Sequence, residues 1–434
     1  MEKAMMGGSI VSKTNSFRFY QWSTTTALLI GYCAYYLCRQ NMSAAFPILE
    51  KHGVTLVQFG MLSSVGTLVY AIGKVITGSF ADGKGGQGKP VFFVGLFGSA
   101  IATLAFGFSS GFILFLIFWT INRTFQSMGW AGLVNILPRW VQKKNYGTVM
   151  GIMSLSYQIG GVVATLFAGL LISLSPTKES LFIIPAVTML VIGFILRPLV
   201  VNRPEDIGLQ SIQNHVHPST EGSKNGHTYF QRFRVLLGNP MFLVVCILSL
   251  CLTFMREVFS FWMPLFFSEL GAKASVAAYK SAVFPLLGCF GTFVAGWFSD
   301  RFLAGKRASI MAFMITGLAL TMLALSNLGV VANTLSFISK EQIAFVLVGL
   351  AGFFLLAPYS FVGGGVVALD FGGHETAATA AGLLDGVGYL GATFAGIGLA
   401  KLVSISGWAS AYSLMLGLSV VCLLLCFVVW KAAK

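Results

Sequence analysis

The sequence predicts an all-α polytopic membrane protein, with twelve transmembrane helices in two pseudo-symmetric six-helix halves. Only 10% of the 434 residues are charged and 56% are hydrophobic, with a mean hydropathy of +0.82. A soluble domain carries about 25% charged residues. Long segments contain no charge, and one polar segment divides the chain near its middle. This composition excludes a soluble globular enzyme and a disordered chain.

The uncharged segments are long enough to cross a bilayer. Five of them exceed the roughly 18 apolar residues of a candidate span: 90–122, 145–177, 308–339, 342–369 and 402–430. The first segment is divided into two spans near Gly107. Shorter uncharged segments give the remaining spans once single charges within helices are allowed. The 50 glycines favour close helix packing in a membrane. In order, the predicted helices cover 22–47, 55–81, 90–109, 112–138, 145–174, 179–198, 240–268, 274–299, 307–327, 341–368, 374–402 and 408–431.

The polar segment 199–239 separates two stretches of spans and sets the predicted domain boundaries. We expect an N-terminal tail at 1–21, a six-helix half at 22–198, a connecting loop at 199–239 and a second half at 240–434. Eighteen of the 28 basic residues fall on the side of the N-terminus, six on the other side and four within spans. Because cytoplasmic loops are rich in Lys and Arg, we expect the tail, the connecting loop and both termini to be cytoplasmic. We expect the membrane to be a bacterial inner (plasma) membrane.

Other classes of partner and chemistry find no support. Topology explains the net charge of +14, so we expect no nucleic-acid partner. No cleavable signal peptide is predicted, because no small-residue cleavage site follows the first apolar stretch. All seven cysteines fall within spans, and no Cys, His or carboxylate cluster has metal-ligand spacing, so we expect no metal and no cofactor. No membrane-embedded His/Asp or Ser/His constellation indicates an enzyme, and we expect a monomer.

The two halves repeat the same landmarks. The first helix of each half carries an arginine, and the second helix ends, 43 or 44 residues later, in a G-x-x-x-D sequence followed by basic residues. These landmarks are Arg39 with Asp82 and Arg256 with Asp300. The helix macrodipole disfavours a carboxylate at a helix C-terminus. We therefore expect both aspartates to pair with cations or amides and to act in gating; solvated loop carboxylates are the alternative.

Arg39 and Arg256 each occupy the seventeenth position of their predicted helix, counted from Ser23 and Pro240. An ionisable side chain within the bilayer costs a few kcal/mol and marks a functional site by default. Guanidinium presents five donors in a planar fork that suits phosphate oxygens. We expect the two arginines to face each other across the central axis and bind an anion. Snorkelling to the interface is the alternative.

Polar residues with helical spacing accompany these arginines. They are Tyr32, Tyr36, Arg39 and Ser43 on the first helix, Gly66, Tyr70, Lys74 and Thr77 on the second, and Arg123, Gln126 and Trp130 on the fourth. We expect them to face inward; an interfacial tyrosine belt is the alternative. Lys74 and Asp385 lie about 12 and 15 Å from the same membrane face. We expect them to pair across the halves; pairing of Asp385 within its own half, or a place beside a watery vestibule, is the alternative.

Several segments resemble one known family. They are GYCAYYLCRQNMSAAFP at Gly31–Pro47, VYAIGKVITGSFAD at Val69–Asp82, FQSMGW at Phe125–Trp130, REVFSFWMP at Arg256–Pro264, and ATAAG with GYLG within Ala378–Gly391. Together they resemble the organophosphate:phosphate antiporter family of the major facilitator superfamily. That family includes the bacterial glycerol-3-phosphate and hexose-6-phosphate exchangers, and the resemblance extends over nearly all twelve helices.

The resemblance implies a secondary transporter that exchanges a phosphorylated organic metabolite for inorganic phosphate by alternating access. The metabolite would be of the sugar phosphate, glycerol phosphate or phosphoglycerate type. Arg39 and Arg256 would clamp the phosphoryl group, and Lys74 would assist. The other residues expected at the substrate site are Tyr32, Tyr36, Tyr70, Trp130, Gln126, Tyr157 and Tyr389.

The sequence also departs from the family pattern. Gln40 stands where many relatives have lysine, Phe261 where the glycerol-3-phosphate branch has an acid, and Tyr157 where it has a histidine. Arg123 and Asp385 occupy positions that we expect to be uncharged in that branch. These departures put glycerol 3-phosphate itself in doubt.

Two other functions remain open. One is a transporter-like membrane sensor of external sugar phosphate, which the family contains. The other is a proton-coupled organic-anion symporter, which Arg123, Glu257 and Asp385 favour because they place charges within spans. We expect these three residues to act in coupling or gating.

Overall fold

The computed structural model describes residues 2–81, 88–210, 236–302, 307–363 and 366–432, and within these ranges every regular element is a helix. The first half contains α1 (Glu2–Tyr35), α2 (Leu37–Gln40), η1 (Asn41–Ala44), α3 (Phe46–Glu50), α4 (Leu56–Ala81), α5 (Gly88–Phe108), α6 (Phe112–Gln126), α7 (Met128–Trp140), α8 (Lys143–Leu174) and α9 (Lys178–Leu196). After η2 (Pro204–Ile207), the second half contains α11 (Pro240–Glu269), α12 (Ala274–Ser281), α13 (Val283–Phe302), α14 (Arg307–Ser326), α15 (Leu328–Thr334), α16 (Lys340–Gly363) and α17 (Val366–Ala432).

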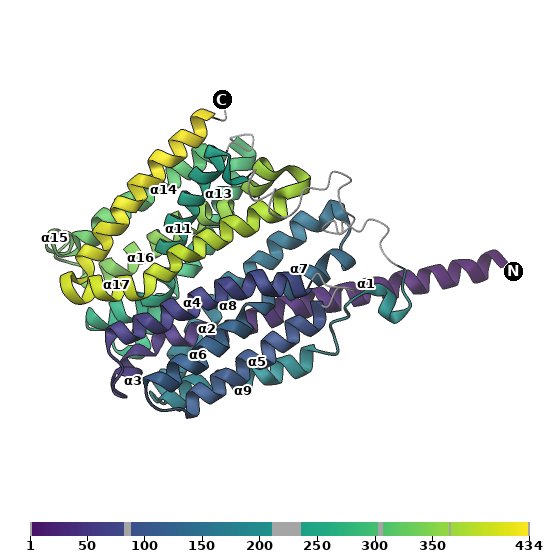
Figure 1. The fold of residues 1–434 in the computed structure, drawn as a ribbon, viewed down its shortest axis with the longest axis horizontal. Coiled ribbons are helices and arrows are strands. Elements are labelled where there is room, and N and C mark those ends of the chain that lie inside the picture. The colour runs from purple at the N-terminus through teal and green to yellow at the C-terminus, as the bar shows by residue number, and fades with distance from the viewer. Residues whose placement is uncertain (1, 82–87, 211–235, 303–306, 364–365, 433–434) are drawn as a thin grey trace.

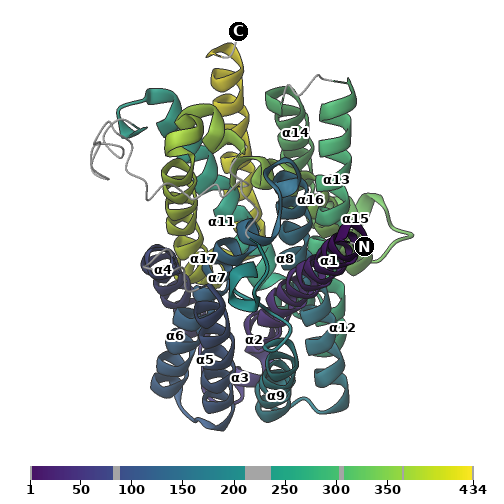
Figure 2. The same cartoon turned by 90° about the vertical axis from the view of Figure 1, so that its right-hand side faces the viewer.

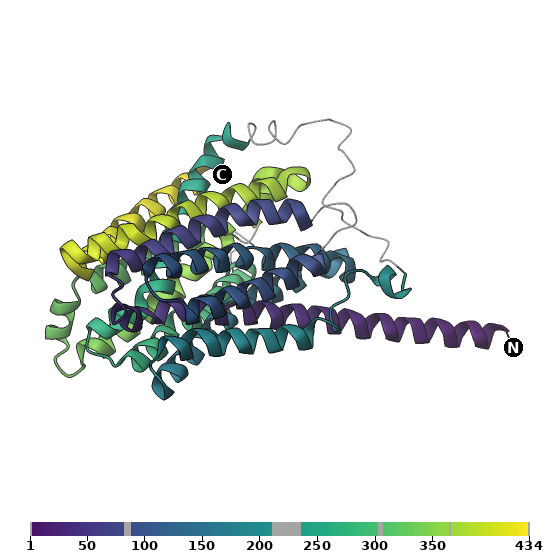
Figure 3. The ribbon, with the colours of Figure 1, turned by 60° about the horizontal axis from the view of Figure 1, so that its bottom comes forward.

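The two halves lie side by side as separate helical bundles (Figure 2). They meet along two seams, where α4 of the first half contacts α17 of the second and α8 contacts α12 and α13. Figure 1 and Figure 3 show α1 extending well beyond the other helices toward the N-terminus. The helix begins at Glu2, so residues 2–21 of the predicted tail are helical and continuous with the span predicted from residue 22.

Nine stretches among the described residues are long and apolar enough to span a membrane. The twelve predicted spans reduce to nine because the first and fourth are interrupted, and because the last two lie in one helical element, α17. Within α17 the chain reverses direction near Gly407, which has a φ of +72° and separates the predicted spans 374–402 and 408–431 (Figure 1). The prediction of an all-helical membrane protein in two halves is confirmed.

The first span is interrupted at Tyr36 because side chains of α6 take its backbone carbonyls. The amide of Gln126 donates to the oxygen of Tyr35 at 2.9 Å, and that of Asn122 donates to the oxygen of Cys38 at 3.2 Å. Polar side chains that enter a helix's hydrogen-bond ladder cause local distortion. Arg39 therefore lies on the short helix α2, just after the interruption at Tyr36.

The end of the bundle that holds α3 and the reversal at Gly407 is closed between the halves. A Cβ atom added at Gly396 would lie 2.3 Å from Ser64 Oγ and 2.6 Å from the backbone oxygen of Gly60. Only glycine permits so close an approach of α4 and α17. Ser64 Oγ also donates to the backbone oxygen of Thr393 at 2.6 Å. Close helix packing and this hydrogen bond therefore hold α4 against α17.

Aromatic rings continue this closure toward the interior. The ring of Phe59 on α4 lies 4.9 Å from that of Phe261 and 5.7 Å from that of Trp262, both on α11. The indole N–H of Trp262 donates to the oxygen of Ala395 on α17 at 2.8 Å. Both halves therefore contribute to a buried apolar layer beside the cavity described below.

Some predicted features fall outside the described residues. Asp82 does so, as does most of the connecting loop, 211–235, and the side chain of Asp300 is not described. The gating role expected for the two aspartates therefore stays a prediction.

Candidate functional site: a cationic cavity between the halves

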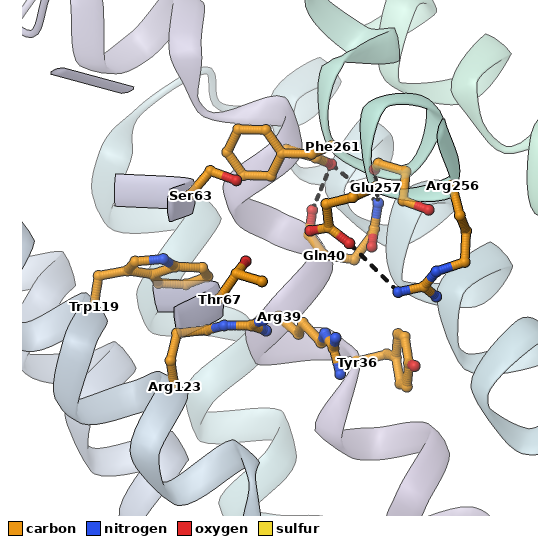
Figure 4. A pocket seen from close by; sticks show the side chains of 12 residues that line it. Tyr36, Arg39, Gln40, Ser63, Thr67, Trp119, Arg123, Arg256, Glu257 and Phe261 are labelled. Carbon is orange, nitrogen blue, oxygen red and sulfur yellow. Dashed lines mark hydrogen bonds and ion pairs between the residues drawn. The ribbon is translucent and has the colours of Figure 1, made fainter. Parts of the chain in front are cut away.

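A cavity lies where the two halves meet (Figure 4). Its walls come from the first span, from α4 and α6 of the first half, and from α11 of the second. Its lining residues are Tyr36, Arg39, Gln40, Ser43, Ser63, Thr67, Trp119, Arg123, Arg256, Glu257, Ser260 and Phe261. Three guanidinium groups thus face one small space that, among these residues, contains a single carboxylate.

Arg39 is held by aromatic neighbours. Its Nη1 donates to the hydroxyl of Tyr70 at 3.4 Å, and its guanidinium carbon lies 4.7 Å from the centre of the Tyr70 ring and 5.3 Å from that of Tyr36. The negative face of an aromatic ring stabilises a desolvated cation. These contacts orient the guanidinium while leaving donors available to a ligand.

Arg256 approaches from the second half. Its Nη2 lies 3.4 Å from Glu257 Oε2, and its guanidinium lies 4.8 Å from the centre of the Tyr359 ring. Its buried Nε has no hydrogen-bond partner in the described part of the chain. Figure 4 shows the side chains of Arg256 and Arg39 extending toward the same space from opposite sides. The structure therefore brings the two arginines to one cavity.

Arg123 lines the same cavity beside Arg39. Its side chain is buried, and its guanidinium carbon lies 4.7 Å from the centre of the Tyr70 ring and 6.0 Å from that of Trp119. The Tyr70 ring therefore contacts two guanidinium groups. Such crowding of like charges is unfavourable unless an anion shares the site.

Lys74 and Asp385 form an ion pair across the two halves, with Nζ 2.5 Å from Oδ2. The pair joins α4 to α17, as the sequence predicts. Lys74 Nζ also lies 4.9 Å from the centre of the Tyr389 ring, and that ring lies 5.2 Å from the ring of Tyr70. The contact between the Tyr389 and Tyr70 rings thus connects the Lys74–Asp385 pair to Arg39.

Six residues expected at the substrate site do not line the cavity: Lys74, Tyr70 and Tyr389, which form the group beside Arg39 described above, and Gln126, Tyr32 and Trp130, which lie elsewhere. The amide of Gln126 is buried and donates to Tyr35 O and to Ser99 Oγ, at 2.7 Å for the latter. The rings of Tyr32 and Trp130 pack against each other at 5.2 Å. Of these, Gln126 holds the interruption of the first span.

Tyr157 lines an adjoining cavity that shares Tyr36, Gln40, Arg256 and Ser260 with the first. Its hydroxyl lies 3.4 Å from Ser360 Oγ of the second half. Gln40 also connects the two halves, because its Nε2 donates to the backbone oxygen of Ser260 at 2.7 Å.

The structure adds lining residues that the sequence analysis does not single out. Ser63 and Thr67 precede Tyr70 by seven and three residues, and Trp119 precedes Arg123 by four, so each shares a helix face with a predicted residue. That spacing is the signal that could have found them. Tyr359, which contacts Arg256 without lining the cavity, carries no such signal, because the residues one helical turn away, Leu355, Leu356 and Val362, are apolar.

Among the described residues, no group of three or more His, Cys, Asp or Glu side chains could hold a metal ion. The seven cysteines carry free thiols.

Sequence comparison finds relatives along nearly the whole chain. A "Probable hexose phosphate transport protein" of Chlamydia pneumoniae is 27% identical and covers 96% of this chain and 93% of its own length. The "Glycerol-3-phosphate transporter" of Bacillus subtilis is 26% identical, with coverage of 94% and 91%. The "Hexose-6-phosphate:phosphate antiporter" of Escherichia coli is also 26% identical, with coverage of 89% and 85%.

Solved structures share the fold. The crystal structure of a D-xylose-proton symporter superposes with a TM-score of 0.71 at 15% identity, covering 94% of this chain and 97% of the symporter. A bacterial homologue of the lysosomal transporter Spinster, in an inward-facing and unoccupied conformation, gives 0.68 at 19% identity, covering 95% and 96%. Residues 28–396 match the Major Facilitator Superfamily, and the chain therefore belongs to that superfamily.

Proposed function

We propose that this protein exchanges a phosphorylated organic metabolite for inorganic phosphate by alternating access. The observation that carries the proposal is the placement of Arg39 and Arg256, one from each half, on a single cavity between them. Guanidinium groups bind phosphate oxygens through paired hydrogen bonds. The relatives named as phosphate-ester transporters support the same substrate class.

The geometry suggests how the anion would drive exchange. A phosphoryl group bound by Arg39 and Arg256 together would offset the repulsion between two buried cations and draw the halves together. A ligand shifts a conformational equilibrium only through its different contacts in the two states. In the absence of an anion the two guanidinium groups repel, so we expect reorientation to be slow without substrate, as obligatory exchange requires.

The distribution of charges also indicates how the protein lies in its membrane. It is an integral membrane protein, and we infer that both termini are cytoplasmic in a bacterial plasma membrane, as the distribution of basic residues indicates. We also infer that the monomer transports, without an enzymatic step, a cofactor or a nucleic-acid partner. Its domain boundaries would lie at the connecting loop 199–239.

Counterflow of labelled phosphate in proteoliposomes tests this function. Vesicles loaded with unlabelled phosphate should accumulate labelled external phosphate, and external phosphate esters should compete. Binding of esters without counterflow would contradict exchange and indicate a sensor. Uptake that needs a pH gradient but no internal phosphate would contradict it in favour of proton symport.

A further inference from the structure

One wall of the cavity carries hydrogen-bond donors that have no acceptor. Trp119 Nε1 and Ser63 Oγ are buried and have no hydrogen-bond partner among the residues that the structure describes. The Arg123 side chain is only 4% exposed and, among the described residues, contacts two rings but forms no ion pair or side-chain hydrogen bond. Buried polar groups are nearly always satisfied, so each exception needs an explanation.

These donors lie together because α4 has a glycine opposite them. A Cβ atom added at Gly66 would lie 2.7 Å from Trp119 Nε1 and 2.9 Å from Arg123 Cγ. Both side chains therefore lie against the backbone of α4, between Ser63 and Thr67 on the same helix face. We call Ser63, Thr67, Trp119 and Arg123 the α4–α6 wall; Figure 4 shows its side chains grouped on one side of the cavity.

The chemistry of this wall specifies its ligand group. Indole N–H and guanidinium can only donate hydrogen bonds, so the complementary group must accept. Glu257 forms an ion pair with Arg256 and acts on Arg123 only from beyond ion-pair distance, so among the described residues no carboxylate pairs with Arg123 directly. A buried charge without a partner is strongly unfavourable, and a sugar hydroxyl supplies no charge. A carboxylate supplies one negative charge and a planar pair of oxygens that matches one guanidinium.

The α4–α6 wall is separate from the position proposed for phosphate. In Figure 4, Arg39 lies between Arg123 on one side and Arg256 on the other. A phosphoryl group bridging Arg39 and Arg256 would leave Arg123 for the organic part of the same molecule. Arg39, Arg123 and Arg256 line one cavity, so the two groups of such a molecule would share it.

We propose that the transported ester is a phosphorylated carboxylic acid whose carboxylate binds the α4–α6 wall. This assignment rests on the proposed function and narrows its substrate class. It gives Arg123 a part in substrate recognition, whereas the sequence suggests coupling or gating.

Two probes of equal carbon number test the assignment. 3-Phosphoglycerate carries a carboxylate where glycerol 3-phosphate carries a hydroxymethyl group. In equilibrium binding to the purified protein, the wild type should prefer 3-phosphoglycerate by about 10- to 100-fold, the range expected for a charge-assisted pair. Arg123→Gln should reduce this preference to about threefold or less, and Trp119→Phe, which removes one donor and keeps the ring, should reduce it partly.

Arg256→Lys is the matched control, because it should weaken the binding of both probes by a similar factor and keep the preference for 3-phosphoglycerate. Arg123→Lys keeps the charge and should retain part of the preference, which separates loss of recognition from loss of fold. A wild type without preference would overturn the assignment. An Arg123→Gln variant that loses both probes and inorganic phosphate equally would also overturn it, because Arg123 would then belong to the phosphate clamp.

The binding measurement also separates this inference from the proposed function. If proteoliposomes show no phosphate counterflow, exchange is refuted, while the binding preference still decides whether the wall recognises a carboxylate.

Discussion

Three arginines share one cavity, and each is compensated differently. Arg256 has Glu257 at 3.4 Å, Arg39 has the hydroxyl and ring of Tyr70, and Arg123 has ring faces and the more distant charge of Glu257. Desolvating three cations in one place costs several kcal/mol per charge. Under the proposed function, an incoming anion, rather than the chain itself, completes the site.

Arg39→Lys and Arg256→Lys should each lower phosphate counterflow by about 10- to 100-fold although the positive charge is retained. Lysine replaces a planar fork of donors by a point charge and cannot bind two phosphate oxygens in parallel. Counterflow at equal protein content in proteoliposomes measures the effect. Near-normal rates in both variants would contradict the clamp.

At the residue scale, sequence spacing predicts which polar side chains turn inward but not what each one contacts. Arg39 and Arg123 line the cavity as their helical positions suggest, and the Tyr70 ring contacts both guanidinium groups. Gln126 shares a helix face with Arg123, yet its amide bonds to the backbone of the first span. Periodicity cannot distinguish these outcomes, because it gives a direction and no partner.

At the element scale, interruptions of helices position the site. The break at Tyr36 follows from the amides of Gln126 and Asn122 on α6, so a neighbouring helix determines where the first span bends. Ser127 ends α6, and its hydroxyl donates to the oxygen of Thr124 at 2.6 Å. The sequence predicts both segments as continuous helices, because their apolar pattern continues through the breaks and the bonds that cause them come from distant residues or a single serine.

Asp385→Asn should lower exchange by about 3- to 10-fold, because it leaves Lys74 without its counter-charge in a partly exposed pair that joins α4 to α17. The exchanged pair, Lys74→Asp with Asp385→Lys, should recover part of the loss of either single variant in phosphate counterflow.

The Lys280–Glu341 pair provides the control for this prediction. Its atoms are 2.7 Å apart at similar exposure, but both residues lie in the second half. Glu341→Gln should therefore affect exchange less than Asp385→Asn does. A double variant at positions 74 and 385 no better than the worse single variant would count against a role for the pair between the halves.

At the scale of the whole molecule, composition and repeated landmarks predict the two-half membrane fold correctly, since these depend on the bilayer and on symmetry. They do not predict which end of the bundle is closed. That end is determined by close contacts between helices far apart in the sequence, at Gly60, Ser64 and Gly396, and by the rings beside them. Alternating access requires these contacts to separate once in each cycle.

Gly396→Val should hold this end apart and abolish net exchange, because the new side chain would meet Ser64 Oγ and the backbone of Gly60 at well under van der Waals distance. Gly398→Val on the same helix is the matched control, since a Cβ atom there meets nothing within 4 Å. The inferred cytoplasmic termini place the closed end, which holds α3, on the outer side of the membrane. With Ser260→Cys as a reporter inside the cavity, a membrane-impermeant maleimide added on that side should react about tenfold faster in the Gly396→Val background, a shift of about 1.4 kcal/mol in the conformational equilibrium. The Gly398→Val background should react like the parent protein. Equal reactivity in all three backgrounds, with exchange intact in Gly396→Val, would mean that the glycine contact between α4 and α17 is not the closure that transport must open.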